Sequence, residues 1–218
     1  MKVLDLFSGL GGWSQAFKDR GHEVVTVDIE KRFNPTICKD IMELTSKDFE
    51  QYGQFDVILA SPPCNCFSIA SVYRHWNKDG TSKSEEEIKS IRLVLHTICL
   101  IQSLRPKFWI MENPTGMLRK IIGLPHYNIA QCQYGRSVMK PTDLWGRLPS
   151  SFIAKKCRAG NTDHEKATRS SKNGIQGILS SLDKGMSVSE RAMIPYGLSL
   201  VVCKSCENEL EQNSEVVQ

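Results

Sequence analysis

The sequence lacks the segments that would carry a protein into or across a membrane. Its 218 residues contain no run of about 18 apolar residues, the length that a transmembrane helix requires. The first residues meet Asp5 at once and therefore lack the long apolar stretch of a secretion signal. No internal repeat and no low-complexity tract interrupts the chain. We therefore expect a protein of the cytosol, with no membrane partner.

Strong charge of either sign is also missing. The formal net charge is only +4, which is compatible with a polyanionic partner but does not identify one. Cysteine, in contrast, occurs eight times, and without a secretion signal we expect free thiols rather than a disulfide framework. The chain is long enough for one α/β domain with a sizeable core and a small appendage.

Short apolar runs alternate with helical patterns over the first part of the chain. The runs that we expect to form strands are residues 2–6, 23–27, 55–60 and 108–111. Apolar spacing predicts helices over 13–20 and 84–104, the second opened by a capping box of Ser84 and Glu87. Strands that alternate with helices predict a mostly parallel sheet with helices on both faces.

Four side chains with chemical capability follow the predicted strands, namely Phe7, Asp28, Cys64 and Glu112. Sheets of this kind bind ligands outside the carboxyl ends of their strands. We therefore expect these four residues to belong to one site.

The turn after the first predicted strand is rich in glycine, with Gly9, Gly11 and Gly12. Such a turn lets the backbone approach a nucleotide-like ligand at a helix N-terminus, although it also occurs where segments merely pack tightly. Asp28 favours the ligand, because a carboxylate at that place can bind both hydroxyls of a ribose. The three glycines do not supply the Gly-x-Gly-x-x-Gly turn of a nicotinamide-dependent oxidoreductase.

Cys64 follows two prolines, which stiffen the turn and hold the thiol in one pose. A cysteine is most often a small buried hydrophobe, but a proline-pinned turn at a strand end is a poor core position. Glu112 ends the strand that we expect beside it and can act as an acid or a hydrogen-bond partner. Taken alone, a glutamate there is usually just solvated.

Taken together, these segments resemble the DNA cytosine-5 methyltransferase family over about 145 residues. Residues 5–13 look like its first motif, 62–64 with 67–68 like its catalytic motif, and 112–114 like its glutamate motif. The small enzymes of bacteriophages and prophages are the most similar members. The segments shared with them are residues 134–135, 140–142, 144–145 and 191–195.

The resemblance implies a Rossmann-like fold that uses S-adenosylmethionine to methylate carbon 5 of a flipped cytosine in double-stranded DNA. Cys64 would be the nucleophile, Glu112 the partner of the base, and Lys140 a supporting cation. The residues expected at the cofactor are Phe7, Gly9, Leu10, Gly11, Gly12, Asp28, Ile29, Asp40, Ile41 and Pro62. Those expected at the nucleic acid are Ser68, Arg74, His75, Lys78, Asn113, Lys156 and Arg169. Residues 65–83 would be the closing loop, with Trp76 on the sugar or base.

The expected organisation is a catalytic and cofactor-binding domain over 1–145, followed by a small irregular insert over 146–186. Residues 187–207 would return to the catalytic domain, and 208–218 would be a polar tail. The cations of the insert are Lys155, Lys156, Arg158, Lys166, Arg169 and Lys172. They predict phosphate contacts, with a solvated surface as the plainer interpretation.

Two departures from the family keep other functions open. Lys140 alone stands where the family has the two arginines of its Gln-x-Arg-x-Arg segment, and the target-recognition region is short. RNA, a free cytosine nucleotide, or binding without catalysis are therefore alternatives. A restriction nuclease is a conceivable partner, and the sequence does not indicate an oligomeric state.

The Cys-x-x-Cys pair of Cys203 and Cys206 raises the question of zinc, with Cys157 and His164 as further ligands. The same spacing fits one face of a terminal helix, and we expect no metal.

Overall fold

The computed structural model describes residues 1–158 and 186–215 and is built on one seven-stranded sheet. The strands are β1 (Lys2–Leu6), β2 (Glu23–Asp28), β3 (Ile37–Cys38), β4 (Val57–Ala60), β5 (Phe108–Pro114), β6 (Tyr127–Ala130) and β7 (Pro141–Arg147). The α-helices are α1 (Gln15–Asp19), α2 (Val72–His75), α3 (Glu85–Leu104), α4 (Leu118–Ile122), α5 (Val188–Ala192) and α6 (Tyr196–Glu215). Four 3₁₀ segments join them: η1 (Lys31–Phe33), η2 (Ile41–Glu43), η3 (Ser46–Tyr52) and η4 (Gln131–Tyr134).

The order of the strands across the sheet is β3-β2-β1-β4-β5-β7-β6. The first five are parallel neighbours, whereas β7 runs antiparallel to both β5 and β6. The order changes direction between β1 and β4, so their carboxyl ends open a crevice where a ligand can bind. The prediction of a mostly parallel sheet with helices is confirmed.

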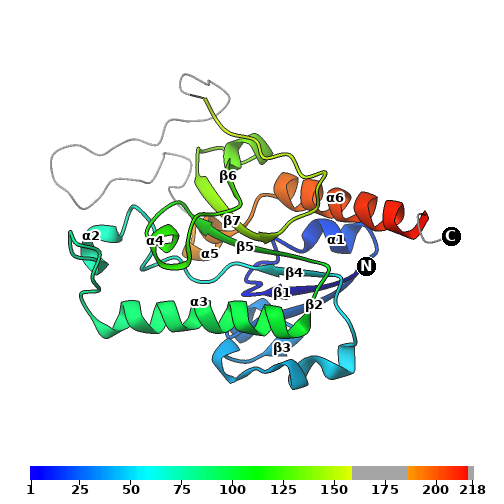
Figure 1. Cartoon of the computed structure of the whole chain (residues 1–218), viewed down its shortest axis with the longest axis horizontal. Coiled ribbons are helices and arrows are strands. Elements are labelled where there is room, and N and C mark those ends of the chain that lie inside the picture. The colour runs from blue at the N-terminus through cyan, green and yellow to red at the C-terminus, as the bar shows by residue number, and fades with distance from the viewer. Residues whose placement is uncertain (159–185, 216–218) are drawn as a thin grey trace.

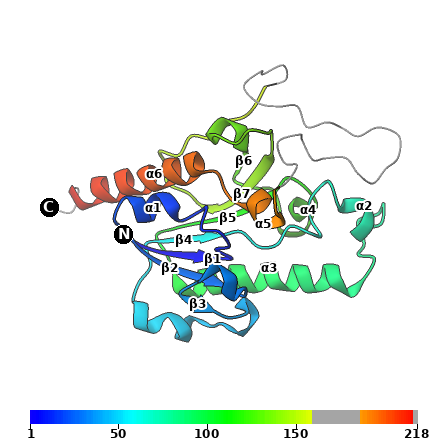
Figure 2. The ribbon, with the colours of Figure 1, turned by 180° about the vertical axis from the view of Figure 1, so that it is seen from behind.

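Each face of the sheet has its own apolar core, because successive side chains of a strand point to opposite faces. Ile58 packs in the cluster beneath α3, while its neighbour Leu59 packs in the cluster with α1 and α6. Figures 1 and 2 show α3 along one face, with α1 and α6 side by side over the other. The sheet is therefore the middle of three layers.

The capping box predicted for the long helix is present. Ser84 accepts from the Glu86 amide at 3.2 Å, and the carboxylate of Glu87 accepts from the Ser84 amide at 2.6 Å. The helix ends at Leu104, as the sequence predicts, and Arg105 follows in a left-handed conformation with φ 48°. These contacts fix where α3 begins, directly after the segment that follows Cys64.

Residues 146–158, which the sequence assigns to an irregular insert, pack closely on the sheet. Strand β7 crosses the expected boundary at 145, and Phe152 is buried in the core over α1 and α6. The carbonyl of Lys155 accepts from the Ala130 amide at 3.0 Å. Residues 146–158 therefore lie on the catalytic body, and the rest of the expected insert, 159–185, lies outside the described residues.

The returning element consists of two helices, since Pro195 separates α5 from α6. Helix α6 continues past the expected end at 207 to Glu215, and Glu209 accepts from the Ser150 amide at 2.5 Å. Within the described ranges, none of the helices is long and apolar enough to cross a bilayer.

Candidate active site

One large cavity, of about 1310 Å³, lies at the carboxyl ends of β1, β2 and β4. Most of the residues expected at the cofactor line it: Phe7, Gly9, Leu10, Gly12, Asp28, Ile29, Asp40 and Ile41. Cys64, Ser68 and Lys140 line the same cavity. Gly11 and Pro62 lie outside its lining. The structure thus joins the expected cofactor turn and the expected nucleophile in one space.

The glycine-rich turn has the backbone shape that its sequence suggests. Gly9 and Gly11 adopt φ +47° and +78°, in the left-handed region that favours glycine, and Phe7 is also left-handed with φ 61°. Asp28 fixes the turn, because its Oδ2 accepts from the Gly9 amide at 2.8 Å. Each carboxylate oxygen has a second lone pair, so Asp28 can still accept from ligand hydroxyls.

Gly12 has a different reason to be glycine. A Cβ added there would lie 2.6 Å from the carbonyl oxygen of Ile194. The close approach lets the segment before α6 rest directly on the turn, and Ile194 lines the cavity too.

Two residues of the first motif, which the sequence did not assign to the site, have buried polar atoms that can still form a hydrogen bond. Asp5 and Trp13 line the cavity and are only 1% and 2% exposed. Within the described residues, Asp5 Oδ1 and Trp13 Nε1 have no hydrogen-bond partner. Buried polar atoms are rarely left unpaired, so a ligand with one donor and one acceptor would complete them. The ammonium and carboxylate of an amino acid, as in the methionine part of S-adenosylmethionine, have this chemistry.

Asp5 predicts a pH dependence of ligand binding. Burial raises the pKa of its carboxyl to about 7. The hydrogen bond that the Ser14 hydroxyl donates at 2.6 Å lowers this pKa but does not offset the effect of burial. A ligand ammonium favours the ionised form, so the Kd for S-adenosylmethionine is expected to fall as pH rises from about 6 to about 8. In Asp5→Asn the Kd should be roughly tenfold higher at the upper end and nearly independent of pH. Calorimetric titration at several pH values measures both.

The same shift makes a prediction about the ligand-free protein. The folded-state pKa lies above the ordinary value of 3.8, so the folded state holds this proton more tightly than the unfolded chain. The free energy of unfolding should therefore fall as pH rises from 3.8 toward about 7. An Asp5→Asn variant that loses stability over this range as steeply as the wild type would contradict the assignment.

The turn that carries Cys64 is held from two sides. Its own carbonyl accepts from the amides of Phe67 and Ser68 at 3.0 and 3.1 Å. Asn113 donates its side-chain amide to the Pro62 carbonyl at 2.9 Å. Asn113 is fully buried, so it positions this turn instead of facing a nucleic acid as expected from the sequence. The end of β5 thereby fixes the turn at the end of β4.

Glu112 affects the protonation of Cys64, and Lys140 acts on both groups. Burial raises the pKa of the Cys64 thiol, Lys140 opposes the rise, and Glu112 adds to it. Burial also raises the pKa of Glu112, against the attraction of Lys140 and Arg136. The charge of Glu112 therefore disfavours the Cys64 thiolate, and Lys140 opposes the effect of burial on both groups.

Glu112 is only 4% exposed and lies outside the lining of the cavity, where other side chains bond to its carboxyl. Gln131 donates to its Oε1 at 3.4 Å and also to the Thr142 hydroxyl at 3.0 Å. Arg136 in turn donates to the Gln131 oxygen at 3.2 Å. Sequence reasoning missed Gln131 and Arg136, because only the folded chain brings η4 beside the end of β5.

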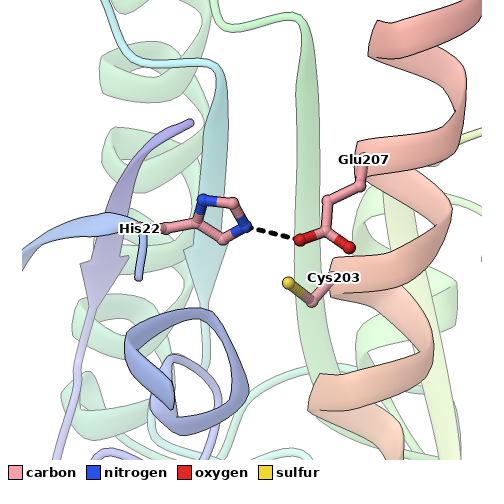
Figure 3. A group of neighbouring side chains, drawn as sticks. All are labelled: His22, Cys203 and Glu207. Atoms are coloured by element: carbon pink, nitrogen blue, oxygen red, sulfur yellow. Dashed lines mark hydrogen bonds and ion pairs between the residues drawn. The ribbon is translucent and has the colours of Figure 1, made fainter. Parts of the chain in front are cut away.

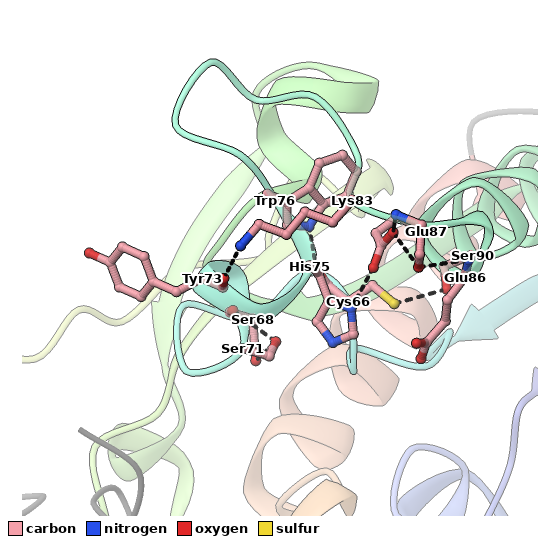
Figure 4. Close-up of polar contacts among 11 residues, drawn as sticks. Cys66, Ser68, Ser71, Tyr73, His75, Trp76, Lys83, Glu86, Glu87 and Ser90 are labelled. Atoms are coloured by element: carbon pink, nitrogen blue, oxygen red, sulfur yellow. Dashed lines mark hydrogen bonds and ion pairs between the residues drawn. The ribbon is translucent and has the colours of Figure 1, made fainter. Parts of the chain in front are cut away.

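The segment after Cys64 is anchored at its base (Figure 4). Trp76 is buried and its indole N–H donates to the Cys66 carbonyl at 2.6 Å, so it packs in the core rather than on a sugar or base. His75 Nδ1 lies 2.6 Å from the Glu87 carboxylate, so the imidazole is engaged within the protein, and its expected phosphate contact stays a prediction. Ser68 pairs with Gly116 in an isolated bridge.

The outer part of this segment is bonded within itself: Lys83 Nζ donates to the Tyr73 carbonyl at 2.5 Å, and the Thr81 amide donates to Asp79 at 2.9 Å. Tyr73 is 85% exposed and points away from the anchored residues in Figure 4. Arg74, Lys78 and Lys156 are exposed, as a role in binding phosphates requires. Arg169, with Lys166 and Lys172, lies outside the described residues, and all these nucleic-acid contacts stay predictions.

Glu87 joins the anchored segment to α3, which predicts a pH-dependent contribution to stability. Burial alone raises its pKa, but hydrogen bonds from His75 and Ser84 lower it to about 2. Its stabilising effect is therefore present above 4.5 and lost as pH falls toward about 2. We expect Glu87→Gln to lower the free energy of unfolding by about 1–2 kcal/mol at pH 7. The difference in the free energy of unfolding between the variant and the wild type should become smaller as the pH falls.

Chemical denaturation at a series of pH values measures this difference. Glu85→Gln is the matched control, because Glu85 is exposed in the same helical turn. Equal losses in the two variants would show that the first-turn charge, and not the capping contact, is responsible.

The Cys-x-x-Cys pair occupies buried positions on α6. Cys203 lies beside His22 and Glu207 (Figure 3), where His22 Nε2 is 2.8 Å from the Glu207 carboxylate. Arg20 also donates to that carboxylate, at 2.9 Å. Burial raises the pKa of Cys203 to about 12, which favours the neutral thiol in an ion-pair network. Of the two further ligands considered, Cys157 donates its thiol to the Arg158 carbonyl at 3.6 Å, and His164 lies outside the described residues.

Comparisons with known proteins agree with this geometry. The sequence model of the family described as C-5 cytosine-specific DNA methylase matches residues 1–131. A probable DNA (cytosine-5)-methyltransferase of Frog virus 3 is 34% identical over 166 residues, covering 72% of this chain and 75% of the viral protein.

Two further relatives are more distant. The tRNA (cytosine(38)-C(5))-methyltransferase of Mus musculus is 27% identical over 174 residues, which are 71% of this chain but 40% of the mouse protein. The solved structure of the Entamoeba histolytica methyltransferase EhMeth matches with a TM-score of 0.52 at 15% identity, over 72% of this chain and 56% of that one. This last likeness supports the fold alone.

Proposed function

Because this chain belongs to the C-5 cytosine-specific DNA methylase family, we propose that it transfers a methyl group from S-adenosylmethionine to carbon 5 of cytosine in DNA. One observation carries the proposal: a single cavity joins the glycine-rich turn and Asp28 to Cys64, with Glu112 directly behind. S-adenosylmethionine supplies the electrophilic methyl group. Its ammonium and carboxylate would bind the buried Asp5 Oδ1 and Trp13 Nε1, which can still form a hydrogen bond.

Cys64 begins the reaction by adding its sulfur to carbon 6 of the cytosine ring, after giving up its proton. Carbon 5 is otherwise a poor nucleophile, and the new bond to carbon 6 gives it enamine character. Carbon 5 would then take the methyl group that S-adenosylmethionine supplies, with S-adenosylhomocysteine as the leaving group. A water molecule would accept the proton from carbon 5, and the electrons of that C–H bond would restore the double bond as the bond between carbon 6 and Cys64 breaks and releases the thiolate.

Glu112 stabilises the charge that this addition creates. Burial raises its pKa, so it can donate a proton to ring nitrogen 3 while its other oxygen accepts from the exocyclic amine. Lys140 lies close enough to affect the charge of both Cys64 and Glu112. It would hold the thiolate before the attack and the carboxylate after the transfer.

The base must leave the duplex to reach Cys64, at a cost of a few kcal/mol. The exposed cations Arg74 and Lys78 follow Cys64 along the chain, where they would hold the phosphates beside the flipped nucleotide. The expected recognition insert supplies Lys156 and Arg169. This proposal places the enzyme in the cytosol of a prokaryotic or phage-infected cell, with or without a partner restriction nuclease.

A methyl-transfer assay tests the proposed function. The full chain is incubated with labelled S-adenosylmethionine and, in parallel, mixed-sequence duplex DNA, RNA or dCMP. Mass spectrometry of the nucleosides then identifies the product. We expect 5-methylcytosine in DNA alone. Labelled RNA or dCMP without labelled DNA would overturn the choice of substrate, and label at a different atom of cytosine would overturn the chemistry.

A further inference from the structure

One polar side chain of the cavity wall, that of Arg136, belongs to no motif of the sequence. Arg136 follows η4, after Gly135 turns the backbone with φ 95°. It lines the cavity on the side of Lys140. Its guanidinium donates to the side chain of Gln131 nearby and to the carbonyls of Arg191 and Met193 in a distant part of the chain.

One arm of Arg136 orients the residue that contacts Glu112. Its Nη1 donates to Gln131 Oε1 at 3.2 Å. Because that oxygen is occupied, the amide nitrogen of Gln131 must face Glu112 Oε1, which it reaches at 3.4 Å. Gln131 is fully buried. Rotating its amide by half a turn would set an oxygen against the carboxyl of Glu112, where it could accept only from the protonated form.

The other contacts of Arg136 hold the chain where it returns after residues 159–185. The Arg191 carbonyl accepts from Nη2 at 2.9 Å, and the Met193 carbonyl accepts from Nη1 at 3.2 Å. Lys140 also reaches the Arg191 carbonyl, at 3.4 Å. The return segment, residues 186–194, therefore docks on the two cations that act on Glu112.

We propose that Arg136 is a positioning residue that couples docking of the return segment to the orientation of Glu112 through Gln131. This inference rests on the proposed function for its catalytic consequence. When the return segment leaves, Arg136 loses two of these acceptors and the Gln131 amide loses its fixed orientation. Glu112 is then held in its catalytic orientation only while the return segment is docked.

A double-mutant cycle tests the proposal. Arg136→Lys keeps the positive charge but loses the planar fork that reaches several acceptors at once. We expect it to lower kcat about 10- to 100-fold, the range for a hydrogen bond to a charged group, with little change in the KM for S-adenosylmethionine. In a Gln131→Met background the same substitution should have almost no further effect on kcat.

A second measurement is independent of activity. Hydrogen exchange should show that the amides of residues 186–194 lose protection in Arg136→Lys but not in Arg20→Lys, the matched control on the far side of the molecule, where Arg20 binds Glu207. Additive effects on kcat, or unchanged protection of the return segment, would overturn the coupling. Absence of methylation by the wild type would instead refute the proposed function, and the exchange result would still decide whether Arg136 holds the segment.

Discussion

Cys64→Ser should reduce methyl transfer about a thousandfold or more, because serine keeps the shape of the side chain but removes the nucleophile. Binding of S-adenosylmethionine should be unchanged, since Asp5, Trp13 and Asp28 are untouched. The reason is specific to this turn: the Pro62 and Cys64 carbonyls hold it through backbone bonds that do not involve the thiol. Steady-state methylation and calorimetric titration of the cofactor measure the two effects.

Cys66→Ser is the matched control for this variant. Cys66 is buried two residues away, its sulfur accepts from Ser90, and its backbone carbonyl accepts from Trp76. Its substitution should leave methylation within a few-fold of the wild type. Equal methylation by the Cys64→Ser and Cys66→Ser variants would contradict the covalent mechanism.

Glu112→Gln should be the second most damaging substitution, lowering kcat roughly 100- to 1000-fold. The amide can still donate a hydrogen bond but cannot deliver or receive a proton. The neutral side chain also removes the negative charge of Glu112, which raises the pKa of Cys64. The thiol of the variant should therefore titrate at lower pH than in the wild type.

Alkylation of Cys64 by iodoacetamide across a pH series measures that titration separately from turnover. The expected pattern is faster alkylation near neutral pH together with slower methylation. A variant in which both rates fall together would indicate a general collapse of the site and would count against the role given to Glu112.

The sequence predicts those parts of the site that depend on strand ends. Phe7, Asp28, Cys64 and Glu112 each follow an apolar run, and parallel strands bring such positions to one edge. The sheet, the long helix and its capping box could be predicted for the same local reasons.

What the sequence could not predict depends on contacts between distant segments. Arg136 and Gln131 have no distinctive spacing, and their role exists only because η4 lies beside β5 and the return segment. Trp76 sits in a polar stretch that suggests an exposed residue, yet a single carbonyl, that of Cys66, makes burial of its indole favourable. Asp5 lies inside a strand, and only the folded chain shows that one of its buried oxygens has no partner among the described residues.

Arg158 and Arg191, which stand on either side of residues 159–185, both line the cavity. On one side Lys155 is bonded to the end of β6, and on the other Met193 is bonded to Arg136. The catalytic body thus offers two fixed attachment points at the mouth of its own active site. Under the proposed function, replacing the intervening stretch with that of a relative is expected to change the target sequence, while the described residues of the cavity stay the same.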